Sequence, residues 1–519
     1  MICMDKLFEK RVRLLSSNTH LAILRSGKRG IEREALRATR TGTLALSSHP
    51  AFLGSSLTHP SITTDFSESM LELVTTACRD SVEVLNQLDD IHRYIYEGIG
   101  NEELWNQSMP CLLPPDGAIP IAYYGVSNAG KLKHQYRQGL ALRYGRSMQC
   151  IAGIHYNFSL NSEIWPILMS LTDSAASLKD FETAAYMGMI RNFDRHRWLL
   201  AYLFGASPAC AGDFMEGRSH SIPYLSSSTL YLPYGTSLRM SKMGYQNDAQ
   251  TGLVRSYNSL ADYLADIGAA LSTSYSPYEE IDRQNKGPLR QLNTHKLQIE
   301  NEHYAMIRPK RIISQGRSLT EELRQYGIQY VELRCIDIDP FSPVGVSLDC
   351  MRFLDIFAHY CILTESAFSD ETEMKHNAHN FNLAVTEGRR PGLTLVTSSG
   401  ERCLRLLGLE VIDQMTSIAD LLDSGLERPV YASALSAQKE KLLNAELTPS
   451  AMVLDGIRGE CNSFVGFSQS ISEEHANFFR NRPLSENRRR QFELLSEVSS
   501  DYQREIEFAE IDKSGLCFN

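Results

Sequence analysis

The stretch Gly30-Ile-Glu-Arg-Glu-Ala-Leu-Arg37 carries two glutamates that stand two positions apart, Glu32 and Glu34. In a β-strand, residues i and i+2 project to the same side, so Glu32 and Glu34 share one face while Ile31, Arg33 and Ala35 share the other. This segment therefore predicts a strand with two neighbouring carboxylates on its polar face.

The same period of two recurs far along the chain. It appears in Met70-Leu-Glu-Leu73, Ile154-His-Tyr-Asn-Phe-Ser159, Leu297-Gln-Ile-Glu-Asn-Glu302 and Tyr330-Val-Glu-Leu-Arg-Cys-Ile336. For any one segment, an ordinary surface strand with a solvated polar face is the simpler interpretation. However, acidic residues are depleted in strands, and here they are concentrated on them. We therefore expect these polar faces to carry a site.

If the strands form one antiparallel sheet, their acidic and imidazole groups converge. The expected cluster is Glu32, Glu34, Glu72, Glu332 and His155, with Asp65 entering from the turn at Thr63-Thr-Asp-Phe66. Carboxylates that lie close together raise one another's pKa, so the cluster requires divalent cations. Oxygen ligands with one imidazole and no thiolate suit Mg²⁺ or Mn²⁺. Two arginines, Arg239 and Arg334, would bind carboxylate or phosphoryl oxygens, and we expect a metal–nucleotide site.

Other segments show helical spacing. Apolar residues recur every three to four positions in 81–96, 348–363 and 417–426. The last forty or so residues, which include Arg488-Arg-Arg490, predict a solvated helix. No repeat or linker divides the chain, so we expect one α+β catalytic domain over 1–519. The sequence motifs that predict the site lie in 30–343, and we expect 344–519 to be largely helical.

Composition excludes several classes of protein. The 519 residues are 43% hydrophobic and 22% charged, which is typical of a folded globular chain. A net charge of −10 argues against a nucleic-acid binder. The eleven cysteines form no C-x-x-C pair and predict reduced thiols. No export signal begins the chain, and the most apolar stretch, 198–211, is too short to span a membrane. We expect a cytoplasmic protein without a membrane partner.

The familiar catalytic motifs are absent. Gly125-Val-Ser-Asn-Ala-Gly-Lys131 has the spacing of a phosphate-binding loop, but Leu132 stands where Ser or Thr would bind Mg²⁺, so we interpret the match as chance. There is no G-x-S-x-G elbow, H-E-x-x-H helix or dinucleotide glycine fingerprint. The residues alone therefore favour magnesium-dependent phosphoryl chemistry on an antiparallel sheet.

A series of ordered motifs resembles a known family. They are Gly30–Arg37, Leu57-Thr-His59, Ile62-Thr-Thr-Asp-Phe66, His155–Ser159, Tyr202-Leu-Phe-Gly-Ala-Ser-Pro208, Glu300-Asn-Glu302, Tyr304, Ile307-Arg-Pro-Lys-Arg311, Tyr330–Arg334, Asp339-Pro-Phe-Ser-Pro343 and Glu387-Gly-Arg-Arg-Pro-Gly-Leu393. Together they resemble the bacterial (type 1) glutamate–cysteine ligases. The resemblance implies a fold similar to the glutamine synthetase catalytic domain, in which a curved antiparallel sheet forms a funnel with helices outside.

The resemblance also implies an activity. It would be the ATP-dependent ligation of the γ-carboxylate of glutamate to the amine of cysteine through γ-glutamyl phosphate, the first step towards glutathione. ATP would be a co-substrate and Mg²⁺ the cofactor, with Mn²⁺ as a substitute. Glutamate, cysteine and ATP would be the partners, and a monomer is the working expectation.

Site residues follow by position. The metal ligands are expected to be Glu32, Glu34, Asp65, Glu72, His155 and Glu332, as the strand faces also indicate. Arg239 and Arg334 resemble the residues that engage glutamate and the transferring phosphoryl group. The cysteine pocket would be lined by Phe66, Tyr136, Leu140, Gln149, Tyr245 and Tyr304, and the nucleotide would meet Asn157 and Lys133.

Three alternatives stay open at this point. A related ligase could use another amine acceptor, with a different pocket around Tyr136, Gln149 and Tyr245. A non-catalytic nucleotide or amino-acid sensor could keep the fold, and a metal-dependent phosphohydrolase could use the same cluster. For the ligase, composition suggests flexible loops at 212–219 and 274–287 that would close over an acyl phosphate.

Overall fold

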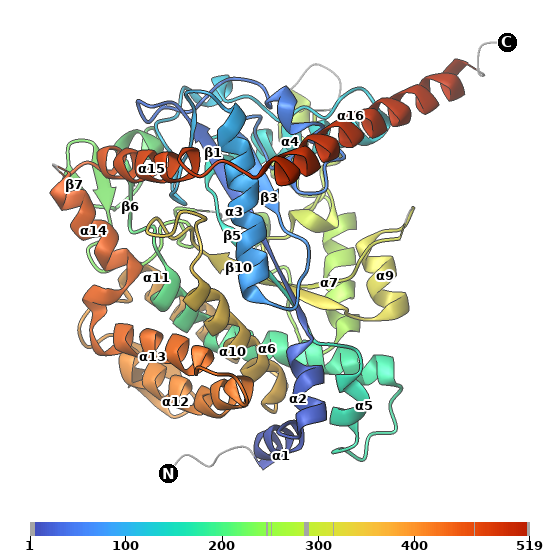
Figure 1. The fold of residues 1–519 in the computed structure, drawn as a ribbon, viewed down its shortest axis with the longest axis vertical. Helices are drawn as coiled ribbons and strands as arrows, with labels where there is room; N and C mark the ends of the chain where they lie inside the picture. The colour runs from blue at the N-terminus through green and yellow to red at the C-terminus, as the bar shows by residue number, and fades with distance from the viewer. Residues whose placement is uncertain are drawn as a thin grey trace.

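A mixed sheet-and-helix architecture is built around one antiparallel sheet. The computed structural model describes residues 6–244, 248–250, 252–284, 290–314, 316–460 and 462–515. The strands lie in the order β2 (Ile62–Thr64), β3 (Met70–Val74), β1 (Lys28–Ala38), β5 (Ile154–Ser159), β10 (Tyr330–Ile336) and β9 (Ile307–Lys310), and β4 (Glu103–Leu104) pairs with the end of β1 (Figure 1). This confirms an α+β protein with an antiparallel sheet.

Strand register places the predicted polar residues opposite one another. Glu34 of β1 pairs with Glu72 of β3, and Glu32 pairs with His155 of β5. On the other side of β5, Asn157 pairs with Glu332 of β10. Since directly paired residues of antiparallel strands project to the same face, one face of the sheet collects the acidic groups.

The other face of the sheet is mainly apolar, apart from buried arginines such as Arg33, and packs on helices. Residues such as Ile31, Leu73, Tyr156 and Leu333 are at most 1% exposed. Figure 1 shows helices stacked against the sheet and below it. The helices are α1 (Lys6–Leu15), α2 (Asn18–Arg25), α3 (Ser81–Gly98), α4 (Asn128–Tyr144), α5 (Ile164–Met169), α6 (Leu178–Phe204), α7 (Leu260–Ser272), α8 (Ser276–Gln284), α9 (Leu319–Tyr326), α10 (Leu348–Leu363), α11 (Glu371–Glu387), α12 (Leu404–Asp423), α13 (Val430–Leu443), α14 (Pro449–Gly459), α15 (Phe464–Arg480) and α16 (Glu486–Gly515).

Two smaller sheets lie outside the main one. They are the hairpin of β11 (Thr394–Thr397) and β12 (Gly400–Cys403), and a three-stranded sheet of β6 (Ala209–Ala211), β8 (Thr229–Tyr231) and β7 (Tyr224–Ser226). Neither carries the acidic residues predicted for the site.

Most predicted elements are confirmed, and one strand is wrong. The helices predicted at 81–96, 348–363 and 417–426 correspond to α3, α10 and the end of α12. However, Leu297–Glu302 is not a strand and ends in a 3-10 helix at Glu300–Glu302. The buried Glu302 carboxylate accepts hydrogen bonds from Tyr144 Oη at 2.7 Å and Arg143 Nη1 at 3.0 Å, so these partners hold the segment outside the sheet.

The two segments predicted to be flexible loops contain helical structure. A 3-10 helix occupies Gly212–Met215, and its Phe214 and Met215 are buried. Helix α8 occupies most of the second segment, whose last three residues, 285–287, lie outside the described residues. Short polar sequences with Gly and Ser do not distinguish a mobile loop from a short helix.

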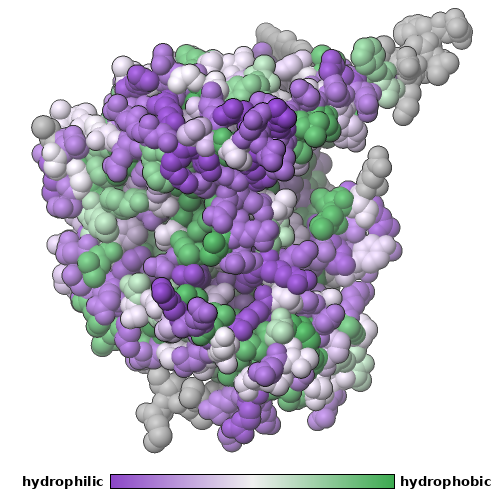
Figure 2. All heavy atoms as spheres, viewed as in Figure 1, coloured by the Kyte–Doolittle hydropathy of each residue, from purple (hydrophilic) through white to green (hydrophobic). Residues whose placement is uncertain are grey.

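The charge run near the C-terminus is only partly solvated. Helix α16 lies beside α3, and Arg488 and Arg489 pair with Asp90 and Glu97 of that helix at 2.7 and 2.6 Å. Figure 2 shows a mainly polar surface with hydrophobic residues in small separate groups. None of the described helices is both long and apolar enough to cross a bilayer.

Buried histidines make an acid-sensitive core. His359 is fully buried, its Nδ1 donates to the Asp355 carbonyl at 2.7 Å, and burial lowers its pKa to about 4. Burial and the nearby Arg33 also lower the pKa of His92. Below pH 6.5 these two histidines bind protons in the unfolded chain but stay neutral in the folded chain. The free energy of unfolding must therefore fall as the pH falls below 6.5.

We expect the free energy of unfolding to drop by about 2 kcal/mol for each of these two histidines between pH 7.5 and 5. The midpoint of urea unfolding, measured at intervals across that range, checks this. A midpoint that stays constant from pH 7.5 to 5 would contradict the assignment of neutral core histidines.

Candidate functional site

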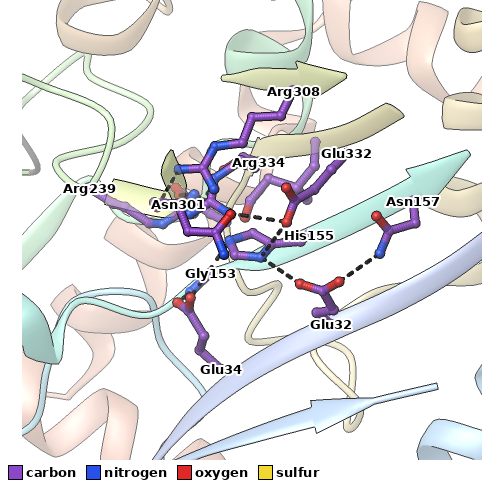
Figure 3. A network of polar contacts seen from close by, with 12 residues as sticks. Glu32, Glu34, Gly153, His155, Asn157, Arg239, Asn301, Arg308, Glu332 and Arg334 are labelled. Carbon is purple, nitrogen blue, oxygen red and sulfur yellow. Dashed lines mark hydrogen bonds and ion pairs between the residues drawn. The ribbon is translucent and has the colours of Figure 1, made fainter. Parts of the chain in front are cut away.

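The polar face of the sheet holds a tight cluster centred on His155 (Figure 3). Its Nδ1 lies 3.1 Å from Glu32 Oε2 and 3.6 Å from Glu332 Oε1, and its Nε2 lies 3.6 Å from Glu34 Oε1. Asn157 Nδ2 donates to Glu32 Oε1 at 2.9 Å. Strands β1, β5 and β10 thus bring together residues separated by as much as 300 positions, as the alternation predicts.

Basic groups border the cluster on the β9–β10 side. Glu332 is only 2% exposed, and its two carboxylate oxygens pair with Arg334 Nη1 at 3.1 Å and Lys310 Nζ at 3.2 Å. These cations lower the pKa of Glu332, and the surrounding carboxylates raise the pKa of Arg334. Both groups are therefore charged at neutral pH.

All six predicted metal ligands line one cavity of about 320 Å³. Its lining residues are Glu32, Glu34, Asp65, Glu72, Leu132, Lys133, Tyr136, Arg137, His155, Leu292, Ile299, Asn301, Arg308, Lys310, Glu332 and Arg334. Lys133, one of the two residues predicted to contact the nucleotide, lines this cavity. The other, Asn157, lies on β5 outside the lining and donates a hydrogen bond to Glu32. The sequence prediction of convergence is confirmed by this geometry.

The electrostatics of the cavity fit a hard divalent cation. One ligand atom from each of Glu32, Glu72 and His155 lies within 4.8 Å of the others. Burial, followed by repulsion from Glu32 and Asp65, raises the pKa of Glu72 well above its usual range. The buried Oδ1 of Asn157 also has no hydrogen-bond partner among the described residues. Close carboxylates together with one imidazole are a donor set that suits Mg²⁺ and Mn²⁺.

A second, smaller cavity of about 120 Å³ adjoins the first. It is lined by Glu34, Asp65, Phe66, Tyr136, Arg137, Leu140, Gln149, His155, Arg239, Met240, Asn301, Tyr304, Ala305, Met306 and Arg334. Five of the six residues predicted for the cysteine pocket are therefore together here. The sixth, Tyr245, lies outside the described residues.

A buried aspartate fixes Arg239, one of the two predicted arginines. Arg239 Nη2 donates to the Arg334 carbonyl at 2.9 Å, and Nη1 lies 3.5 Å from Asp337 Oδ1. Asp337 is 1% exposed and also accepts hydrogen bonds from the hydroxyls of Ser207 and Ser237. Sequence reasoning missed Asp337, which follows the end of β10 and carries no alternation signal.

Other cavity residues were also missed. They are Arg137, Asn301, Arg308, Lys310 and Met240. The signal for two of them was available, because Arg308 and Lys310 stand two positions apart in Ile307-Arg-Pro-Lys-Arg311 and so share a strand face. Glu332 pairs directly with Arg308 across the β9–β10 ladder.

No cysteine side chain of the described residues lines either cavity. Cys335 follows Arg334 on β10 but faces the core, where it is 3% exposed and burial raises its pKa to about 12. The eight cysteines within the described residues are free thiols, and seven of them are buried. A buried neutral thiol is a weak nucleophile.

Comparison with known proteins places this geometry in a family. The family model for glutamate–cysteine ligase matches residues 12–384. The glutamate–cysteine ligase of Janthinobacterium sp. (strain Marseille) is 49% identical over 504 residues, covering 97% of this chain and 96% of that protein. The enzyme of the same name from Pseudomonas fluorescens (strain Pf0-1) is 47% identical, covering 98% and 96%.

Solved structures agree with the sequence comparisons. A crystal structure of glutamate–cysteine ligase from Francisella tularensis in complex with AMP aligns with a TM-score of 0.86 and 33% identity, covering 93% of this chain and 94% of that chain. A bifunctional glutathione synthetase from Pasteurella multocida shares the fold, with a TM-score of 0.75, 24% identity and coverage of 94% of this chain and 58% of that chain. The chain belongs to the glutamate–cysteine ligase family.

Proposed function

We propose that this protein joins the γ-carboxylate of glutamate to the amine of cysteine at the expense of ATP, giving γ-glutamylcysteine, ADP and phosphate. This is the first step of glutathione synthesis. Family membership carries the assignment of the reaction. The observation that supports it in the molecule is the cluster of carboxylates and arginines that lines two adjoining cavities.

We assign the larger cavity to ATP and divalent metal. Glu32, Glu34, Asp65, Glu72, His155 and Glu332 would hold Mg²⁺, with Mn²⁺ as a substitute, and Lys133 and Asn157 would lie near the nucleotide. Magnesium, when bound, supplies positive charge that offsets the negative charge of the phosphate oxygens. Lys310 and Arg308 add positive charge at the β9 edge of the same cavity.

In the first half-reaction the glutamate γ-carboxylate attacks the γ-phosphorus of ATP, the bond from that phosphorus to the bridging oxygen breaks, and γ-glutamyl phosphate and ADP form. A free carboxylate does not acylate an amine, because it has no good leaving group, and phosphorylation provides one. Arg334 lines both cavities and donates from a planar fork, so it is placed to bind the phosphoryl group in transfer. Arg239, fixed by Asp337, would orient glutamate.

In the second half-reaction the cysteine amine attacks the acyl phosphate and phosphate leaves. The smaller cavity would bind cysteine through Phe66, Tyr136, Leu140, Gln149, Tyr245 and Tyr304. Its lining is mixed aromatic, apolar and polar, with no thiol-reactive group among the described residues. Cysteine and 2-aminobutyrate differ only by a thiol in place of a methyl group. Packing contacts distinguish such similar side chains by only about 1–3 kcal/mol, so 2-aminobutyrate should be accepted as an alternative amine.

The remaining expectations concern the whole molecule. The sheet and its covering helices would act as a funnel similar to the glutamine synthetase catalytic fold, with the polar face inside. The chain would work as one domain over 1–519, in the cytoplasm and as a monomer. These proposals rest on family resemblance, with the continuous core of the sheet and helices as support.

An assay with purified protein tests the function and separates it from the alternatives. ADP and γ-glutamylcysteine are followed with ATP, Mg²⁺ and glutamate, with and without cysteine, and again after EDTA. We expect product only with all four components and none after EDTA. Equal phosphate release without amino acids would indicate a phosphohydrolase, and faster ADP release with another amine would indicate a different ligase. No turnover with any amine would favour a binding protein.

A further inference from the structure

The C-terminal helix α16 makes a second set of contacts, away from α3. In Figure 1 it lies across the molecule beside the start of α4. The Glu507 carboxylate accepts a hydrogen bond from the Val126 amide at 2.8 Å, and the Glu510 carboxylate accepts one from the Asn128 amide at 2.6 Å. Asn128 is the first residue of α4, so its amide has no intrahelical acceptor, and Val126 directly precedes the N-cap Ser127. The two carboxylates therefore hold the entry to α4 and complement its dipole.

The same stretch of α16 also forms hydrogen bonds with the loops that contain Thr58 and Tyr124. Gln503 Nε2 donates to the Tyr124 carbonyl at 3.3 Å, and Thr58 Oγ1 donates to the Ser499 carbonyl at 2.5 Å. Gly125 adopts a φ of +83°, and a Cβ at this position would collide with Gln503 and Glu507. Those two side-chain ends could move aside, but the positive φ of residue 125 favours glycine at this position.

Tyr124 connects these contacts to two residues that line both cavities, Asp65 and Arg137. The Tyr124 hydroxyl donates to the carbonyls of Thr64 and Asp65 at 2.8 and 3.0 Å. Its ring packs beneath the guanidinium of Arg137, whose carbon lies 4.6 Å from the ring centroid. Arg137 in turn donates through Nε to the Asp65 carbonyl. Tyr124 thus couples the Asp65 turn to α4.

Helix α4 forms one wall of both cavities. Its Lys133 faces the larger cavity and its Leu140 the smaller one, while Tyr136 and Arg137 line both. The arginines assigned to glutamate and the phosphoryl group come from other segments: Arg239 from the loop before residue 245 and Arg334 from β10. A displacement of α4 would therefore affect the nucleotide and cysteine sides before the glutamate side.

We propose that Glu507 and Glu510 of α16 are positioning residues for the ligase reaction, which act by anchoring the start of α4. The inference rests on the proposed function, because it concerns the binding of ATP and cysteine. It assigns a role to a C-terminal segment whose sequence looks like a solvated, charged helix. Neither carboxylate touches a substrate, so the effect passes through Tyr124 and the α4 wall.

The test compares Glu507→Ala/Glu510→Ala with Glu505→Ala in the full chain. Glu505 is an exposed acid on the same helix and serves as the matched control. For the double variant we expect the KM values for ATP and cysteine to rise about 3- to 10-fold, with kcat and the KM for glutamate within about twofold of wild type. Hydrogen exchange at 126–137 should also become faster, a readout that does not depend on catalysis.

The double glutamine variant, Glu507→Gln/Glu510→Gln, keeps an acceptor oxygen at each position. Its KM values for ATP and cysteine should therefore be close to those of wild type. If the double alanine variant does not fold, Glu510→Ala alone is used instead. It should raise the KM values for ATP and cysteine by a smaller factor and leave the KM for glutamate unchanged. A lower melting temperature with unchanged KM values and exchange would overturn the proposal and leave α16 a purely structural element. Failure of the wild-type protein to form product would instead overturn the proposed function.

Discussion

Arg334→Ala is expected to lower kcat for γ-glutamylcysteine formation by at least about 10³-fold, the range found where an arginine stabilises a transferring phosphoryl group. The side chain lines both cavities, and three nearby groups, Glu332, Glu34 and Glu32, keep it charged. The fold should survive, because Glu332 keeps its pair with Lys310 at 3.2 Å. Steady-state ADP release with saturating glutamate and cysteine measures the effect.

Arg334→Lys is the informative companion variant. Lysine retains the charge but loses the planar fork, so its rate should fall between those of wild type and the alanine variant. A melting curve for each variant separates lost chemistry from lost structure. An alanine variant within tenfold of the wild-type rate would remove Arg334 from the phosphoryl-transfer step.

The second large effect is expected for Glu32→Gln, which should lower turnover by about three orders of magnitude. A metal ion contributes several kcal/mol of charge stabilisation, and each 1.4 kcal/mol corresponds to a factor of ten in rate. Glutamine has nearly the same shape as glutamate: its one carbonyl oxygen can still accept a hydrogen bond from Asn157 Nδ2, and its amide can donate to Nδ1 of a neutral His155. The variant should therefore fold while lacking one anionic ligand. Product formation over a range of Mg²⁺ concentrations measures the loss.

Glu103→Gln provides a matched control for this variant. Glu103 is a buried carboxylate on β4, which pairs with β1, but it lines neither cavity and accepts a hydrogen bond from Gln469 at 2.7 Å. Its turnover should stay near that of wild type. If the two variants lost activity equally, the effect would come from removing buried charge and not from the proposed metal site.

The sequence predicted the centre of the site well because strand alternation is a local signal. Glu72, His155 and Glu332 each stand between apolar residues, and Glu32 stands two positions before Glu34; the period of two sets which face each side chain occupies. The sequence does not state which strands are neighbours. The observed order, with β5 between β1 and β10, is what places His155 among three carboxylates.

The parts that sequence reasoning missed depend on contacts between distant segments. Asn301 reaches both cavities from a short 3-10 helix that reads as a strand, and a single buried acid, Glu302, holds that turn in place. Likewise, the acidic end of α16 resembles a solvated helix until the amides of Val126 and Asn128 are placed beside it. Periodicity within a segment carries no information about such partners.

Manganese binding to the protein without nucleotide tests the central claim most directly. Free Mn²⁺, followed by electron paramagnetic resonance as protein is added, should fall for the wild-type protein and recover when excess Mg²⁺ competes. Glu32→Gln and Glu72→Gln should each weaken that binding by at least about tenfold, whereas Glu103→Gln should not. Equal uptake of Mn²⁺ by all four proteins, or no uptake by the wild type, would contradict the account of a metal site on the polar face of the sheet.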